Sequence, residues 1–130
     1  MSQAGGGGRR PHLPEQVVIE AYGGGGFRFA GMSHRGSLLA LPSGLYAWDV
    51  ANPERLGEAD FAELLLETAR IDVLLIGTGG EMRPLPEALR WQFRDRRIQA
   101  DAMQTGHAVR TYNILIAENR RVAGAFVAVE

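Results

Sequence analysis

The sequence of 130 residues contains no cysteine, no lysine and no long apolar run. Because cysteine is absent, disulfides, thiolate metal sites and a cysteine nucleophile are excluded. Because lysine is absent, neither a Schiff base nor an ammonium general base can form, and all 14 basic residues are arginine. The longest apolar stretch, residues 122–129, is much shorter than the roughly 20 residues that a membrane helix needs. We therefore expect no transmembrane segment and a cytoplasmic location, with peripheral membrane association left open.

Charge is nearly balanced overall but unevenly distributed. The formal net charge is −1, which argues against nucleic acid as a main partner. Residues 49–81 hold eight acidic side chains and two arginines, whereas residues 83–121 hold eight arginines and four acidic side chains. Two solvated helix faces of opposite sign explain this pattern, and a basic face that contacts a partner is the alternative. The three histidines show no metal-ligand spacing, so we expect neither a metal nor a cofactor.

The composition predicts one domain preceded by a tail. Residues 1–14 are rich in glycine and predict a disordered tail, and residues 15–130 are enough for a single core. Alternating and β-branched stretches predict strands at 16–22, 27–30, 37–41, 45–48, 71–76, 98–102 and 122–129. Apolar residues at spacings of three and four predict helices at 58–68, from Pro84 or Pro86 onward, and at 106–118. The order of these elements predicts a three-layer α/β domain, with a central mixed, mostly parallel sheet flanked by helices and an additional N-terminal antiparallel β-hairpin layer.

Residues 71–86 are the stretch around which the other elements are organised. A run rich in Val, Leu and Ile leads into Gly-Thr-Gly-Gly at 77–80, and a proline-marked helix start follows. This pattern is typical of a buried parallel strand that turns sharply into a crossover helix. A dinucleotide site is the alternative, because the first two glycines have G-x-G spacing and Asp101 ends the next strand. Met82 stands where the third glycine belongs, so a tight turn is the favoured interpretation.

The second candidate stretch, residues 103–113, opens the last predicted helix. Thr105 is the expected N-cap, and Arg110 and Asn113 share one side of the helix. We expect this helix to begin near the glycine turn, since both follow the carboxyl ends of strands. Arg83 would then join Arg110 in a shallow pocket for an anion.

An ion pair is the alternative role of Arg110. In that case the guanidinium bonds Asp72 or Glu81 and only ties the helix to the loop. No catalytic residue can be assigned from the sequence. The candidate ligand- or partner-binding residues are Gly77, Thr78, Gly79, Gly80, Arg83, Met103, Thr105, Arg110 and Asn113.

Three short motifs carry a family resemblance. They are Ile-Gly-Thr-Gly at 76–79, Met-x-Thr at 103–105 and Arg-Thr-Tyr-Asn-Ile-Leu at 110–115. In this order they resemble the family of the mitochondrial complex I assembly factor 3, which includes uncharacterised bacterial proteins, and the likeness covers about residues 16–129. The resemblance implies a three-layer α/β fold with a central mixed sheet and no established catalytic activity. Val109 stands where many relatives have a cysteine, so no thiol-based role is expected.

Two functional hypotheses follow from these observations. The first is a non-enzymatic binding module that helps to assemble or stabilise a membrane-associated complex such as respiratory complex I, with a protein as its partner. It depends on the resemblance and on the lack of a complete catalytic constellation. The alternative is a binding protein or enzyme for a small anionic ligand, which would use the pocket between residues 77–83 and 105–110. A homodimer through Trp91 and its neighbouring arginines is a third, lesser hypothesis.

Overall fold

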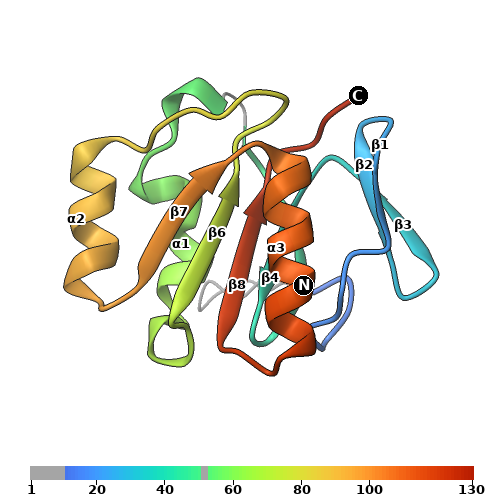
Figure 1. Cartoon of the computed structure of the whole chain (residues 1–130), viewed down its shortest axis with the longest axis horizontal. Coiled ribbons are helices and arrows are strands. Elements are labelled where there is room, and N and C mark those ends of the chain that lie inside the picture. The colour runs from blue at the N-terminus through green and yellow to red at the C-terminus, as the bar shows by residue number, and fades with distance from the viewer. Residues whose placement is uncertain (1–10, 51–52) are drawn as a thin grey trace, which may run out of the picture.

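Figure 1 shows the computed structural model of the chain, which describes residues 11–50 and 53–130. A five-stranded sheet forms its centre, with the strand order β5-β4-β8-β6-β7. The bounds are Ser37–Leu41 for β4, Gly44–Trp48 for β5, Val73–Gly77 for β6, Gln99–Met103 for β7 and Val122–Phe126 for β8. β6 is parallel to β7 and β8, whereas β4 is antiparallel to β5 and β8. The predicted mixed sheet is confirmed, with as many antiparallel as parallel pairs.

A second, antiparallel sheet lies beside the first (Figure 1). Its strands are β1 (Ala21–Gly23), β2 (Gly26–Phe29) and β3 (Met32–Arg35). The predicted N-terminal hairpin layer is confirmed and is extended by β3, for which the sequence gives no prediction. Phe27 and Phe29 alternate with Arg28 along β2, so the two rings are buried and the guanidinium is exposed. In the β1–β2 turn, Gly24 and Gly25 have φ angles of +62° and +86°, which glycine adopts without strain.

One face of the five-stranded sheet is covered by α3 (Thr105–Ala117) and the small sheet. The rings of Phe27, Tyr112 and Phe126 meet in this layer, and the Tyr112 and Phe126 rings are T-shaped with centroids 5.4 Å apart. In Figure 1, α3 lies in front of the sheet. Ala108 and Tyr112 of this helix are both fully buried in the layer.

The other face is covered by α1 (Ala62–Leu65) and α2 (Glu87–Asp95). Phe61 and Phe93 make an edge-to-face contact at 5.3 Å between ring centroids in this second core. Helices on both faces of the sheet confirm the predicted three-layer architecture. Within residues 11–50 and 53–130, no helix has both the length and the apolar character needed to cross a membrane.

The continuous helix predicted over 58–68 is wrong. The segment contains η3 (Glu58–Phe61), α1 and η4 (Thr68–Arg70), after the short η2 (Pro53–Arg55). The indole Nε1 of Trp48 donates to the carbonyl of Asp60 over 2.6 Å. This bond occupies an acceptor that a regular α-helix would use for the amide four residues later. A side chain distant in sequence therefore competes with the local helical pattern.

The amino-terminal segment joins the fold earlier than predicted. Residues 1–10 of the predicted tail lie outside the described residues, but the last part of that tail pairs with β5. The amide of His12 donates to the carbonyl of Leu45 over 2.7 Å, and the amide of Leu45 donates to the carbonyl of Leu13 over 2.9 Å. The predicted strand 16–22 is regular only from Ala21 onward, because the preceding residues bond to side chains of α3 instead of to a ladder.

Candidate functional site

The glycine turn, residues 77–83, leaves the carboxyl end of β6 in close contact with the start of α3. A Cβ on Gly77 would lie 2.8 Å from the Cα of Thr105, so only glycine fits there. Gly79 has a φ of +104°, a conformation that L side chains rarely adopt. Gly80 has open space around its Cα and is exposed. The fold itself therefore requires the G-x-G part of the motif.

Thr105 ties this turn to two other segments through its buried hydroxyl. The hydroxyl donates to the carbonyl of Val127 over 2.7 Å and accepts from the amide of Gly79 over 3.0 Å. The amide of Thr105 also donates to the carbonyl of Gly79 over 2.8 Å. The predicted N-cap role of Thr105 is wrong, because Gln104 holds the N-cap position and the Thr105 side chain points across to its neighbours. The Thr105 side chain therefore joins the segments that follow β6 and β8.

Thr78 closes the other half of the turn. Its hydroxyl donates to the carbonyl of Glu81 over 2.7 Å and accepts from the amide of Arg83 over 3.0 Å. Its own amide donates to the carbonyl of Met103 at the end of β7 over 2.9 Å. The amides of Thr78 and Gly79 are thus bonded within the protein. They are not available to cradle a pyrophosphate, which removes the support for a dinucleotide at this turn.

The two arginines expected in one anion pocket have different surroundings. An Arg83 guanidinium nitrogen lies 3.3 Å from a carboxylate oxygen of Glu54, and both side chains are partly exposed. Arg110 is exposed and makes no ion pair with any residue in the described ranges 11–50 and 53–130. Asp72, which the sequence offers as a partner of Arg110, pairs with Arg121 at 3.6 Å instead.

Arg110 lines an open groove between α3 and the segment that leads into β1. The groove has a volume of about 350 Å³, and its lining residues are Ile19, Glu20, Ala21, Tyr22, Gly106, Val109, Arg110 and Asn113. The Tyr22 hydroxyl lies over Gly106 so closely that a Cβ there would be 2.4 Å from the oxygen. We call this region the α3 groove.

Asn113 and Tyr112 have structural roles that the sequence does not reveal. The Asn113 side chain accepts from the amide of Ile19 and donates to its carbonyl, each over 2.8 Å. The Tyr112 hydroxyl donates to the carbonyl of Val17 over 2.7 Å. Together they hold the extended segment before β1 against α3. The alternation of residues 16–22 indicates an extended conformation, but it does not identify side-chain amide and hydroxyl groups as the partners.

The titration of Tyr112 reflects this structural role. Burial of the hydroxyl raises the pKa of Tyr112 well above the usual value for tyrosine, with a smaller opposing effect from the Gln16 side chain. A phenol with a raised pKa stays protonated at neutral pH and remains a hydrogen-bond donor. Among the described residues, no group of three or more His, Asp or Glu side chains is placed to hold a metal.

Proteins of known sequence and structure resemble this chain over most of its length. An uncharacterized protein of Rhodobacter capsulatus is 34% identical over 119 residues, which make up 92% of this chain and 90% of that protein. NADH dehydrogenase (ubiquinone) 1 alpha subcomplex assembly factor 3 of Mus musculus is 27% identical over 88% of this chain. The chain spans 62% of the length of that mouse protein.

A crystal structure described as an outer membrane protein from Bartonella henselae has the same fold. It is 51% identical in sequence, superposes with a TM-score of 0.88, and matches over 92% of this chain and 100% of that one. At the level of the family, residues 19–127 match "Protein of unknown function (DUF498/DUF598)". The match includes every strand and helix from β1 to β8, so the chain belongs to this family.

Proposed function

We propose that the protein is a non-enzymatic binding module that helps to assemble or stabilise a membrane-associated protein complex, respiratory complex I in particular. The observation that carries this proposal is the similarity to proteins named as assembly factor 3 of NADH dehydrogenase over 88% of the chain. The proposal places the protein in the cytoplasm, with peripheral contact to the membrane through its partner. It depends on analogy with relatives, so it needs a direct test.

The α3 groove and the exposed part of the glycine turn are the proposed contact surface. The polar side chains of Thr78, Thr105 and Asn113 are used within the fold, which leaves Arg110 as the cation facing outward. Two exposed apolar side chains lie beside it, Tyr22 in the lining of the same groove and Ile114 one turn further along α3. Arginine and tyrosine are enriched at protein interfaces, where a planar cation and an amphipathic ring bind with little loss of entropy.

Affinity purification of the tagged protein from its own host, with gently solubilised membranes, tests the assembly role. We expect subunits of the respiratory complex to copurify, and the double variant Arg83→Ala plus Arg110→Ala to lose them. Arg90→Ala, an exposed arginine of α2, is the matched control and should retain them. If the gene is deleted and the respiratory complex stays at its full level, the assembly role is wrong.

A small anionic ligand in the α3 groove is the second candidate function. The observation that favours it is that Arg110 makes no ion pair with a described residue while it lines the groove beside Tyr22. Arg110→Ala should then abolish ligand binding and leave the melting temperature within a few degrees. A variant that binds as well as the wild type would exclude this site.

The proposed homodimer would use Trp91, whose ring is 52% exposed and lies under the guanidinium of Arg94 at 4.9 Å. Sedimentation that shows only monomer at high protein concentration would exclude it.

A further inference from the structure

A second group of arginines lies at the opposite end of the sheet from the glycine turn. β6 and β8 begin there, α3 ends there, and the β4–β5 turn reaches the same edge (Figure 1). A pocket of about 320 Å³ opens at this edge, and its lining residues are Gln16, Pro42, Arg70, Arg120, Arg121 and Val122. We propose that this arginine pocket binds the phosphate group of a ligand.

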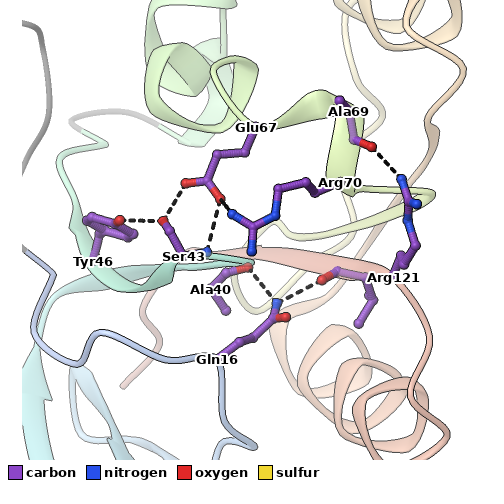
Figure 2. Close-up of polar contacts among 9 residues, drawn as sticks. Gln16, Ala40, Ser43, Tyr46, Glu67, Ala69, Arg70 and Arg121 are labelled. Carbon is purple, nitrogen blue, oxygen red and sulfur yellow. Dashed lines mark hydrogen bonds and ion pairs between the residues drawn. The ribbon is translucent and has the colours of Figure 1, made fainter.

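Arg121 is held in place by bonds to the segment before β6. One of its terminal nitrogens donates to the carbonyl of Ala69, and its Nε lies 3.6 Å from a carboxylate oxygen of Asp72 (Figure 2 shows the first contact). A guanidinium has five N–H donors, so these two contacts leave others available. A partly anchored guanidinium loses less entropy when it binds a ligand than a free side chain does.

Arg70 is positioned by Glu67, which is itself fixed by Ser43. A terminal nitrogen of Arg70 lies 3.7 Å from a carboxylate oxygen of Glu67, and the arginine side chain is 61% exposed. The Glu67 carboxylate accepts from the amide and the hydroxyl of Ser43, and that hydroxyl also bonds the phenol of Tyr46 (Figure 2). The Glu67 carboxylate is thus hydrogen-bonded to Ser43, while its 3.7 Å contact with Arg70 is longer than a hydrogen bond and leaves the N–H donors of Arg70 available.

The floor of the pocket is rigid. The side-chain amide of Gln16 donates to the carbonyl of Val122 over 2.7 Å and to that of Ala40 over 3.4 Å (Figure 2). These bonds join the amino-terminal segment to the two central strands β4 and β8. The guanidinium groups therefore surround a fixed surface.

Arg120 is the arginine of this pocket whose side-chain donors are available to a ligand. Its backbone amide donates to the carbonyl of Leu115 at the end of α3, while its exposed side chain makes no ion pair with a residue of the described ranges. The negative end of the α3 dipole favours a cation at this position. Arg70, Arg120 and Arg121 all line the pocket, and two of them have a carboxylate partner, Glu67 for Arg70 and Asp72 for Arg121.

Phosphate is the anion that suits this arrangement. The planar donor fork of arginine matches the oxygens of a phosphate group, and several forks together bind it more selectively than single point charges do. The volume is at the lower end of the range for ligand pockets, which favours a phosphate with a small substituent. A soluble phosphomonoester and a lipid headgroup share this chemistry.

Titration of the full chain with pyrophosphate, against chloride at matched ionic strength, tests the proposal. We expect saturable chemical-shift changes at the Nε–H signals of Arg120 and Arg121, and a melting temperature that rises with pyrophosphate concentration. Arg120→Gln should weaken binding by about tenfold or more, because it removes charge-assisted hydrogen bonds without breaking an ion pair of the fold. Absence of saturable changes in the wild type would overturn the proposal.

Two further comparisons make the result specific. Arg90→Gln removes an exposed arginine from α2 and should bind pyrophosphate as the wild type does; an equal loss in this variant would mean that only general charge attraction is measured. Vesicles containing phosphatidic acid test the lipid source of the phosphate. If the wild type sediments with these vesicles and Arg120→Gln does not, the result supports the pocket. If Arg120→Gln sediments as much as the wild type does, the result counts against it.

This pocket does not depend on the proposed assembly function. The arginine pocket uses neither Arg83 nor Arg110, and the copurification experiment leaves Arg120 intact. Failure of one experiment therefore leaves the other interpretable.

Discussion

The two ends of the central sheet use their polar groups in opposite ways. At the carboxyl ends of β6, β7 and β8, the hydroxyls of Thr78 and Thr105 bond backbone groups of neighbouring segments, and both residues are buried. At the amino ends of β6 and β8, three arginines surround an open pocket. The comparison shows that glycines and threonines after a parallel strand can be required for closure alone. In this protein the threonine hydroxyls of the glycine turn are used within the fold, whereas the opposite end carries three arginines around an open pocket.

The largest effect is expected from Gly77→Ala, which tests how tightly the carboxyl end is closed. The new methyl group would lie 2.8 Å from the backbone of Thr105, so the turn and α3 must move apart. We expect the free energy of unfolding to fall by about 3 kcal/mol in a denaturant titration. Gly80→Ala, in the same turn but with open space, is the control and should change it by less than about 0.5 kcal/mol. Equal effects of the two substitutions would contradict the close packing.

Thr105→Val tests the buried hydroxyl at the same end. Valine keeps the shape of the side chain but leaves the amide of Gly79 and the carbonyl of Val127 without their partner. We expect a loss of about 2 kcal/mol in the free energy of unfolding. Thr105→Ser keeps the hydroxyl and should be less destabilised than the valine variant. A valine variant as stable as the wild type would show that these bonds contribute nothing.

Tyr112→Phe tests the hydrogen bond by which α3 holds the amino-terminal segment. Loss of the bond to Val17 should lower the free energy of unfolding by about 1 kcal/mol at neutral pH. Because burial raises the pKa of Tyr112 in the folded protein, this tyrosine ionises first in the unfolded chain. The contribution of Tyr112 to the free energy of unfolding is therefore complete below about pH 10. Above that pH it falls by up to about 1.4 kcal/mol per pH unit.

The measurement is a series of denaturant titrations between about pH 8 and pH 11, because an ordinary tyrosine begins to ionise in this range. Stability of the wild type should decline more steeply than that of Tyr112→Phe above about pH 10. Tyr22 and Tyr46 are present in both proteins, so they contribute equally to the two curves. Parallel curves would mean that the Tyr112 phenol is not protected from ionisation.

The smallest effect is expected at the open end, from Arg120→Gln without phosphate. The side chain is exposed and makes no ion pair with a described residue, so the free energy of unfolding should change by less than about 0.5 kcal/mol. Thermal unfolding in chloride buffer measures it. A large loss would show that this arginine is part of the packing and would make the two ends of the sheet alike.

Local patterns were sufficient to predict most of the elements but not the long-range bonds between them. The run rich in Val, Leu and Ile before the glycine turn identifies β6, and the apolar spacing over 106–118 identifies α3. The helix predicted over 58–68 is interrupted in the structure, and the carbonyl of Asp60 within it bonds the Trp48 indole, a partner that the pattern of the segment does not indicate.

For the candidate site, the sequence predicts which segments lie together but not which side chains are used within the fold. The sequence correctly brings residues 77–80 next to Thr105, since the carboxyl ends of parallel strands share one edge. It cannot show that the Asn113 side chain is hydrogen-bonded to the backbone of Ile19, a residue 94 positions away. Nor does it show that Arg70 approaches Arg120 and Arg121, because their common pocket exists only after β6 and β8 have paired.

The position of β8 in the sheet has a consequence for synthesis on the ribosome. β8 is the last strand of the chain, yet it lies between β4 and β6 and is the only link between the β4–β5 and β6–β7 pairs within the described part of the sheet. Until residues 122–126 have emerged, the inner edges of β4 and β6 lack the strand that pairs with both of them in the folded sheet. Closure is then a single late event that joins distant parts of the chain, which favours slow folding. Loss of these few residues would therefore remove the connection between the two parts of the sheet, not merely shorten one edge.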